Sequence, residues 1–440
     1  MEIQQFVTEA LGDSSYIVIG NGVAAAVDPQ RDIRPLLRVA EGRNVAIEYV
    51  FETHVHNDYV SGGRELAARG AKIVAAAKSE LQFPHLPVED GAEIEFGGAR
   101  LRATSAPGHT YQHTAYIAID ERGTTRAAFT GGALLMGSAG RTDLLGSAHT
   151  AELTRLQWES AQKLAKMLPL SSSVFPTHGA GSFCSSTGSA LERSGPFSLE
   201  AERNPALTSL SAEAFASIQL ATNPPIPGYY RHIAPINRAG ARVFGEPPTP
   251  AHLEPDGLAN TTATVIDIRP RQAFAAGHVP DSLEIEESGS LLAYVGWLVP
   301  FNGPIVLVSE DRAQAERITV DLFRIGYEDV RGYLTFSEWH RAGRPIAELG
   351  IATVADAREI LADGTLPVID TRFADEHNSQ PLRGALKLPF DELSSWAAFA
   401  PPRSLVVCAS GQRATMAASA LQKAGREVVA LMDGGVEDLV

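Results

Sequence analysis

Residues 404–425 read SLVVCASGQRATMAASALQKAG. The apolar run that ends at Cys408 predicts a buried strand, the residues ASGQR predict a loop, and a helix is expected from about Ala414. Backbone amides in such a turn point inward and meet the positive end of the helix dipole, which stabilises a thiolate. Gly411 permits the tight backbone path, and Arg413 adds a cation at the rim. The stretch predicts an α/β domain with Cys408 as a reactive thiol.

The same order of strand, loop and helix occurs a second time upstream. Predicted strands at 264–268 and 368–371 carry the related sequences IDIR and IDTR. Aligning Ser309 with Cys408 also aligns two glycines, each 17 positions further along the chain. Matching strands, loops, helices and glycines indicate two copies of one α/β unit rather than chance periodicity.

The Cys408 loop resembles that of the rhodanese family, whose pattern is Cys-x-x-Gly-x-Arg. The Asp-x-Arg element at 370–372 and the closing Asp-Gly-Gly turn at 433–435 match the family as well. The resemblance implies that Cys408 takes up a sulfur atom as a persulfide and passes it to a thiol or another acceptor. It also implies that Gly411 shapes the loop and that Arg413 holds an anionic sulfur donor. The family's acidic-glycine-histidine stretch is altered here, beginning at Glu376.

The upstream copy keeps much of the rhodanese scaffold but has Ser309 in the place of the cysteine. A hydroxyl of ordinary pKa cannot carry sulfur as a persulfide. The neighbouring Glu310 and Asp311 would repel an anionic donor. We expect this copy to be a catalytically silent packing or docking domain. Its retained scaffold residues are Asp267, Arg269, Gly277, His278 and Pro280.

Histidines follow several predicted strand ends in the first 240 residues. The stretch THVHNDY at 53–59 follows a strand predicted at 46–51, and the turns PGHT and PTHG occur at 107–110 and 176–179. A single histidine is more often a core or surface residue than a ligand. Imidazoles that converge from separate strand ends are how α/β scaffolds build metal sites, so four in this context favour one.

This histidine pattern resembles the metallo-β-lactamase superfamily, and within it the persulfide dioxygenases and their rhodanese fusions. The stretches GRTD at 140–143 and HGAGSFC at 178–184 belong to the same resemblance. In that family one Fe(II) is held by two histidines and one aspartate, at the positions of His54, His109 and Gly132. Gly132 removes the only anionic ligand, and Tyr59 replaces the last histidine of the signature, so a pair of zinc ions is not expected.

The remaining residues predict a site for one metal ion, Fe(II) or Zn(II). Because Gly132 replaces the aspartate, the alternative is that the site is empty and the domain is a structural relic. The expected ligands are His54, His56 and His109, with Asp58 and His178 as further candidates that bind the metal, substrate or water. From the resemblance, the expected substrate-binding residues are Tyr59, Arg141 and Cys184. Cys184 is either a persulfide-carrying thiol or a small buried hydrophobe.

Bulk composition limits the classes of partner. The chain has 440 residues, a formal net charge of -15 and two cysteines. The negative charge argues against nucleic acid and anionic membranes as partners. No signal peptide or membrane span is recognisable, and two distant cysteines do not form a disulfide framework, so we expect a cytoplasmic protein.

Proline-rich stretches at 223–227 and 247–250 indicate linkers. The expected fold class is α/β, with a metallo-β-lactamase αββα sandwich followed by two rhodanese-like domains with parallel sheets. The expected boundaries are 1–245 for the sandwich, 246–348 for the copy without the nucleophile and 349–440 for the copy with Cys408.

Three functional hypotheses follow. The first is an enzyme of sulfane-sulfur metabolism, in which Cys408 acts as a sulfurtransferase and the first domain takes a persulfide, with O2-dependent oxidation if iron is bound. The second makes the first domain a zinc hydrolase acting on a thioester or similar bond. The third makes it a metal-free binding or regulatory module. Expected partners are small-molecule thiols, persulfides or thiosulfate, and the family resemblance implies a homo-oligomer formed through the first domain.

Overall fold

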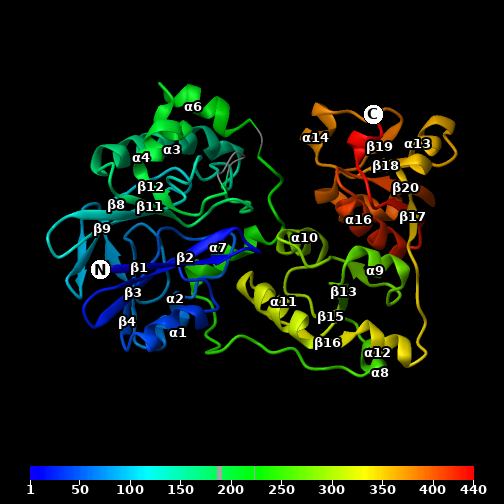
Figure 1. The fold of residues 1–440 in the computed structure, drawn as a ribbon, viewed down its shortest axis with the longest axis horizontal. Helices are drawn as coiled ribbons and strands as arrows, with labels where there is room; N and C mark the ends of the chain where they lie inside the picture. Colours follow the sequence, from blue (N-terminus) through cyan, green and yellow to red (C-terminus); the bar gives the residue numbers. More distant parts are fainter. Residues whose placement is uncertain (186–190, 222) are drawn as a thin grey trace. The chain divides into compact units, whose positions relative to one another are not determined.

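The structure is a computed structural model that describes residues 1–185, 191–221 and 223–440. The chain divides into two compact units, Met1–Pro247 with Arg324–Gly326, and Pro248–Phe323 with Tyr327–Val440. Figure 1 traces the first unit from blue to green and the second from green to red.

Two six-stranded sheets form the first unit. The first sheet has the order β1 (Glu2–Thr8), β2 (Asp13–Ile19), β3 (Val23–Val27), β4 (Ala46–Phe51), β5 (Lys72–Ala76) and β6 (Leu86–Val88). The second has the order β12 (Gly195–Pro196), β11 (Ser173–Pro176), β10 (Thr125–Gly131), β9 (Thr114–Ile119), β8 (Ala99–Ser105) and β7 (Glu93–Phe96).

The strands alternate between two apolar layers because successive side chains point to opposite faces of a sheet. Tyr16 and Phe51 of the first sheet pack against Tyr116 and Phe129 of the second, which gives a core between the sheets. Ile17 and its neighbours on the opposite face pack against helices instead. These outer helices are α1 (Arg34–Gly42) and α2 (Gly63–Ala67) on the first sheet, and α3 (Ser147–Met167), α4 (Phe197–Arg203), α5 (Pro205–Thr208) and α6 (Ala212–Gln219) on the second.

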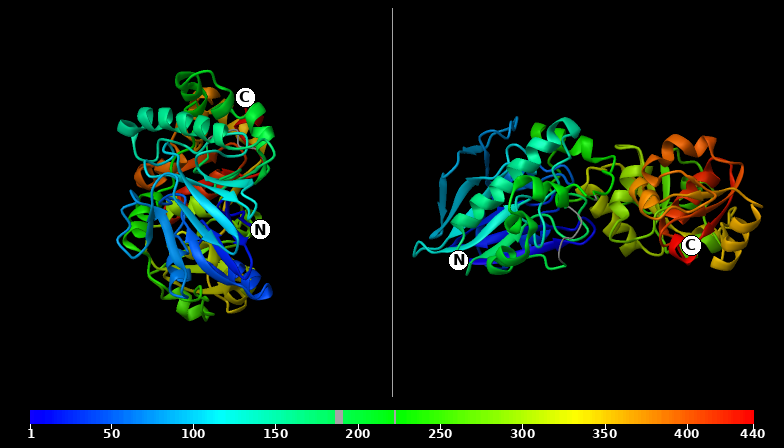
Figure 2. Two further views of the ribbon diagram at one scale, coloured as in Figure 1. Left: turned by 90° about the vertical axis from the view of Figure 1, so that its left-hand side faces the viewer. Right: turned by 90° about the horizontal axis from the view of Figure 1, so that it is seen from above.

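The long helix α3 lies along the outer face of the second sheet (Figure 2). Helix α7 (Tyr230–Ala239) follows the layered part of the unit. The order helix, sheet, sheet, helix confirms the αββα sandwich predicted from the sequence.

The second unit contains two parallel sheets, as predicted. The first has the order β14 (Leu283–Glu284), β13 (Thr264–Asp267), β15 (Ile305–Ser309) and β16 (Val330–Thr335). The second has the order β17 (Gly350–Ala352), β21 (Glu427–Leu431), β20 (Arg403–Val407), β18 (Val368–Asp370) and β19 (Ala385–Lys387). Asp267 pairs with Val308 and Asp370 with Val407, so the two copies share one register.

Helices connect the parallel strands of both copies. In the upstream copy they are α8 (Pro255–Ala259), α9 (Arg271–Ala276), α10 (Leu291–Leu298), α11 (Arg312–Arg324) and α12 (Phe336–Arg341). In the copy with Cys408 they are α13 (Val354–Asp363), α14 (Ala374–Ser379), α15 (Leu393–Trp396) and α16 (Gln412–Lys423), with short 3-10 turns η1 (Phe390–Glu392), η2 (Ala397–Phe399) and η3 (Val436–Asp438).

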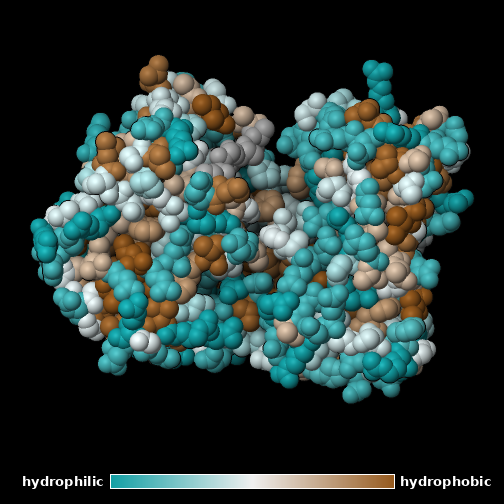
Figure 3. Space-filling view, in the orientation of Figure 1, coloured by the Kyte–Doolittle hydropathy of each residue, from teal (hydrophilic) through white to brown (hydrophobic). Residues whose placement is uncertain are grey.

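Hydrophilic residues cover much of the face drawn in Figure 3, as expected from the strongly negative net charge. Within the described part of the chain, none of the helices combines the length and the apolar character that crossing a membrane requires.

Candidate functional site

Strand β20 leads directly into the loop that holds Cys408. Gly411 has a φ of +82° and donates its backbone N–H to the Cys408 Sγ over 3.1 Å. A Cβ atom at position 411 would overlap the carbonyl oxygen of Met432, so both the conformation and the space require glycine. Helix α16 begins at Gln412, two residues before the predicted start, because Gly411 already caps it. The sulfur therefore faces an amide donor beside a helix N-terminus.

Arg413 does not stand free at the rim of this loop. Its two terminal nitrogens bind the Glu376 carboxylate over 2.5 and 2.7 Å, and its guanidinium lies 4.5 Å from the centre of the Phe373 ring. The expectation that Arg413 holds an anionic donor stays a prediction, and in this structure the guanidinium is paired with Glu376 instead. The altered stretch at Glu376 supplies the carboxylate, so Arg413 acts as a positioning residue for the loop.

The upstream copy has a different loop at the corresponding position, with Arg312 where the other copy has the left-handed Gly411. The Ser309 hydroxyl donates to the backbone carbonyl of Asp311 over 2.9 Å. Gln314 stands at the position that matches Arg413, and its amide donates to the carbonyl of Ile268 over 3.1 Å. The serine is thus used in a local turn, and this arrangement offers no nucleophile.

In the first unit, the buried Asp28 carboxylate joins the ends of strands β4 and β11. It accepts hydrogen bonds from the backbone N–H and the hydroxyl of Thr53, each 2.7 Å long, and another from the Thr177 hydroxyl. His54 and His178 are the residues that follow these two threonines. Asp28 therefore brings together two histidines that lie far apart in the sequence.

Three imidazoles converge at the sheet edge. The Nε2 atoms of His54 and His178 lie 3.3 Å apart, and the ligand atoms of His54, His109 and His178 all lie within 4.8 Å of one another. Two metal–nitrogen bonds of about 2.0–2.1 Å in a tetrahedral site hold their nitrogens roughly 3.4 Å apart. The Nε2 atom of His109 is buried and has no hydrogen-bond partner among the described residues. An unpaired buried nitrogen at this spacing fits a metal ligand.

The hydrogen bonds assign tautomers that leave Nε2 free for a metal. Thr53 donates its hydroxyl to Asp28, so His54 donates its Nδ1–H to the Thr53 oxygen over 2.9 Å. His109 donates its Nδ1–H to the carbonyl of Arg141 over 2.8 Å. Burial, together with the neighbouring imidazoles, holds the pKa of His54 and of His109 well below the usual range, so both rings are neutral.

His178 has a different environment, since two carboxylates lie beside its Nδ1. The distances are 2.9 Å to Asp13 Oδ1 and 3.2 Å to Asp58 Oδ2. Burial alone lowers the pKa of His178, but these two carboxylates outweigh it and raise the pKa to about 10. Without a metal, His178 carries a proton on Nε2 that it donates to His54. A metal that binds at Nε2 displaces this proton.

The trio differs from the predicted set His54, His56 and His109. His56 instead points its Nε2 towards Tyr59 Oη at 2.9 Å, Asp28 Oδ1 at 3.3 Å and Glu52 Oε2 at 3.6 Å. Buried acceptors surround the His56 Nε2, whereas Asp13 turns His178 towards His54. His56 nevertheless lies in a second group of ligand atoms, with Asp58 and His178, that are within 4.8 Å of one another, so it stays a candidate ligand. The further candidate Asp58 supports His178 through its Nδ1.

The position of the missing carboxylate is closed by histidine rings. A Cβ atom on Gly132 would lie 2.5 and 2.6 Å from ring atoms of His109. The backbone N–H of Gly132 donates to Nε2 of the buried His113 over 2.9 Å. The sequence analysis did not single out His113. Its only signal is its spacing four residues after His109, which is common in chains without a site.

The three predicted substrate-binding residues are buried and already engaged. Arg141 binds Asp143 with two hydrogen bonds of 2.7 and 2.8 Å and also donates to backbone carbonyls, so it braces the loop. Tyr59 bonds with His56. Burial raises the pKa of the Cys184 thiol well above its usual range, which favours the small buried hydrophobe over a persulfide carrier.

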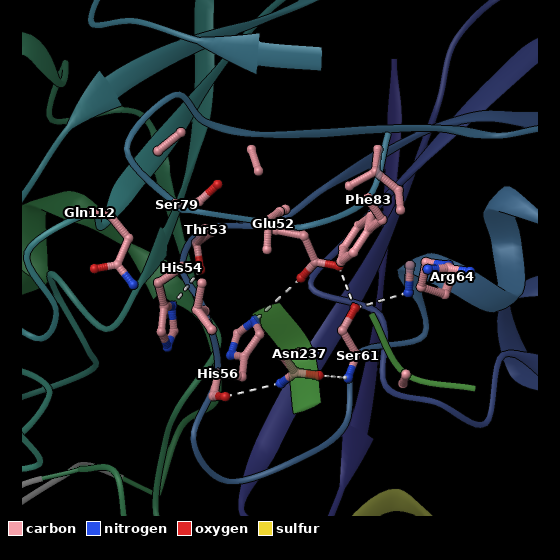
Figure 4. A pocket seen from close by; sticks show the side chains of 17 residues that line it. Glu52, Thr53, His54, His56, Ser61, Arg64, Ser79, Phe83, Gln112 and Asn237 are labelled. Carbon is pink, nitrogen blue, oxygen red and sulfur yellow. Dashed lines mark hydrogen bonds and ion pairs between the residues drawn. The ribbon is translucent and has the colours of Figure 1, made fainter. Parts of the chain in front are cut away.

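A pocket lies against His54 and His56 on the side of Glu52, as Figure 4 shows. Glu52 accepts a hydrogen bond from Ser61 and pairs with His56, which holds this wall together. Arg64 lies over the Phe83 ring at 5.2 Å. Most of the remaining lining is apolar, from Val55, Ile73, Ala75, Ala76, Leu81 and Ala241.

Comparisons with known proteins agree with both halves of the chain. Residues 7–179 match the Metallo-beta-lactamase superfamily, and residues 255–342 and 353–440 each match the Rhodanese-like domain. A crystal structure of a metallo-beta-lactamase from Staphylococcus aureus superposes with a TM-score of 0.69 at 25% identity, covering 76% of this chain and 99% of that one.

Two curated relatives illustrate the range of chemistry. The human persulfide dioxygenase ETHE1 is 30% identical over 227 residues, which cover 50% of this chain and 80% of that protein. A hydroxyacylglutathione hydrolase of Methylococcus capsulatus is 35% identical over 162 residues, 36% of this chain. The match spans only 58% of that hydrolase's length.

We predict that Gly132→Asp does not supply the missing ligand. Because its Cβ would collide with His109, the variant loses about 1–3 kcal/mol of stability, as expected for overpacking. Thermal unfolding and metal titration check this, with Gly42→Asp as the control, because an added Cβ there meets nothing within 4 Å and neither glycine has a positive φ. A stable Gly132→Asp variant with tighter metal binding would contradict the closed position.

We also predict that Asp13→Asn weakens metal binding about 10–100-fold, because a carboxylate that orients a histidine ligand raises its basicity. Competition with a chromophoric chelator measures the affinity. Asp120→Asn, on the distant β9–β10 turn, is the matched control. Unchanged affinity in Asp13→Asn would show that His178 is not a ligand.

Proposed function

Because the chain belongs to the metallo-beta-lactamase superfamily and carries two rhodanese-like domains, we propose that it is an enzyme of sulfane-sulfur metabolism with a sulfurtransferase centre at Cys408. Its partners are small-molecule thiols and their sulfur-carrying derivatives. The observation that carries the proposal is the hydrogen bond from the Gly411 amide to the Cys408 Sγ.

The proposed transfer has two displacements. The Cys408 thiolate attacks the transferable sulfur of the donor, the donor's bond to that sulfur breaks, and its remaining part leaves with the electron pair. An acceptor thiolate then attacks the outer sulfur of the Cys408 persulfide and restores the Cys408 thiolate. The Gly411 amide lies 3.1 Å from the Cys408 sulfur and donates a hydrogen bond to it.

In the first unit, His54, His109 and His178 would hold one metal ion through their Nε2 atoms. When bound, Fe(II) supplies O2-dependent oxidation of a persulfide, and Zn(II) supplies Lewis-acid catalysis of hydrolysis. We place the substrate in the pocket against His54 and His56. Arg64 lines this pocket and could bind an anionic group of the substrate. The similarity to a persulfide dioxygenase over 80% of its length supports a sulfur substrate.

Hydrolysis of a thioester by a zinc form is the second candidate for this unit. It is favoured by the ligand set, since three neutral imidazoles without a carboxylate suit Zn(II) better than Fe(II). Similarity to hydroxyacylglutathione hydrolases supports it as well.

We predict that Cys408→Ser abolishes sulfur transfer, lowering the rate about a thousandfold or more because the nucleophile is lost. Thiocyanate formed from thiosulfate and cyanide, and thiol persulfide formed from an organic persulfide, are the two measurements. Cys184→Ser is the matched control and keeps full activity, because that thiol is buried and protonated. Full activity in Cys408→Ser would disprove the assignment of the nucleophile.

Elemental analysis of the full chain, purified from its native host, distinguishes the forms of the first unit. We expect close to one metal ion per chain, and the metal is lost in His178→Ala but retained in His85→Ala, outside the trio. Iron together with oxygen uptake on adding a persulfide supports oxidation, and zinc supports hydrolysis. A chain without either metal would refute the metal site and leave a binding module.

A further inference from the structure

The upstream copy, which has no cysteine, contributes side chains to the Cys408 site. Gln412 lies within the Cys408 loop pattern, and its amide nitrogen donates to the Ser288 hydroxyl over 3.2 Å. Its amide oxygen accepts a hydrogen bond from the Tyr294 hydroxyl over 3.4 Å. Ser288 and Tyr294 both belong to the upstream copy, so one loop residue is held from the neighbouring domain.

Aromatic rings from both copies meet beside this loop. Tyr294 lies edge-on to Phe390 with ring centres 5.4 Å apart, and Trp297 lies 5.4 Å from Phe373 and 6.1 Å from Phe390. Phe373 also carries the Arg413 guanidinium on its face. We name the set Tyr294, Trp297, Phe373 and Phe390 the aromatic wall. Tyr294, Trp297 and Phe373 are partly exposed and give the site an apolar side on which carbon groups of a ligand can pack, while the buried Phe390 supports them from behind.

The charges around the Cys408 loop do not favour thiosulfate, a donor with two negative charges. Arg413 is bound by Glu376, and Arg372 is bound by Asp370, with a shortest distance of 2.7 Å. The exposed loop side chains belong to Ala409 and Ser410, which are neutral. Thus none of the loop's exposed side chains is a cation, and both guanidinium groups of the site are already paired. Side-chain charge cannot stabilise two negative charges on a donor here.

From these contacts we propose that Cys408 takes its sulfur from an organic persulfide rather than from thiosulfate, and that the aromatic wall recognises the organic group. The upstream copy is then part of the substrate site, not only a packing domain. This inference rests on the proposed sulfurtransferase function and narrows its substrate class.

The reaction balances without an oxidant or reductant. The Cys408 thiolate attacks the outer sulfur of RS–SH, a new S–S bond forms at Cys408, and the RS–SH bond breaks. RS⁻ leaves with the electron pair and takes a proton from water. Cys408 is buried, so the leaving RS group must pass the side chains at the edge of the loop, where Tyr294 lies.

Single-turnover loading of Cys408 tests the proposal with the full chain. Equal concentrations of N-acetylcysteine persulfide and of thiosulfate are supplied separately, and the sulfur added to the Cys408 peptide is followed by mass spectrometry. We expect the organic persulfide to load Cys408 about tenfold faster or more. Its organic group packs on the aromatic wall, and it brings less negative charge to the loop than thiosulfate does.

Two variants separate recognition from folding. Trp297→Ala, which leaves the Tyr294–Gln412 hydrogen bond to the loop in place, slows loading by the persulfide about tenfold and changes loading by thiosulfate less than about twofold, because the lost ring packs against the organic group. Ser410→Lys, at an exposed loop position, raises the thiosulfate rate about tenfold. Phe399→Ala, an aromatic side chain 86% exposed in the same copy, is the matched control and changes neither rate.

The outcomes are distinguishable. If neither donor loads Cys408, the proposed function fails and this inference fails with it. If thiosulfate loads wild-type Cys408 as fast as the persulfide, or if the wall variant slows both donors equally in a chain that melts normally, only the inference is overturned.

Discussion

The hydrogen bond from the Gly411 amide to the Cys408 sulfur is the contact on which the functional account depends. It exists because the chain turns through a left-handed conformation at Gly411, against the backbone of Met432, and then enters α16. No other residue type fits this turn without moving that backbone. The Arg413–Glu376 ion pair fixes the other end of the loop, so a steric requirement at Gly411 and a charge pair at Arg413 both hold the loop.

In the first unit, histidine rings occupy the space beside Gly132. The His109 and His113 rings lie against this turn, and the ligand atoms of His54, His109 and His178 converge within 4.8 Å of one another. The carboxylates of this region, Asp13 and Asp58, lie behind His178 instead of within the trio. The candidate site thus has negative charge close to His178, while its three candidate ligand atoms are imidazole nitrogens.

The fold and the position of Cys408 at the end of a buried strand were accessible from the sequence because their signals are local. Strand β4 lies where the sequence analysis expected it, at Ala46–Phe51, and the loop pattern after β20 identifies Cys408. What the sequence analysis did not find depends on contacts between distant residues. The pairing of Arg413 with Glu376 joins positions 37 apart. Whether His178 or His56 joins His54 and His109 depends on the direction in which each ring is turned. The spacing of histidines in the sequence does not predict that direction.

The two copies of the α/β unit show why duplication does not mean redundancy. One copy keeps the strand register and the Asp-x-Arg element but uses its serine in a turn. Its helix α10 nevertheless lies against the loop of the other copy, through Tyr294 and Trp297. The copy without a cysteine therefore still borders the Cys408 loop of the other copy.

The central claim is that the Gly411 turn makes Cys408 the sulfur carrier of this chain. Peptide mapping after reaction with one equivalent of an organic persulfide tests it most directly. The account predicts one added sulfur atom on the Cys408 peptide, none on the Cys184 peptide, and loss of that atom when a thiol acceptor is added. Sulfur found on Cys184, or a Cys408 peptide of unchanged mass, would contradict it.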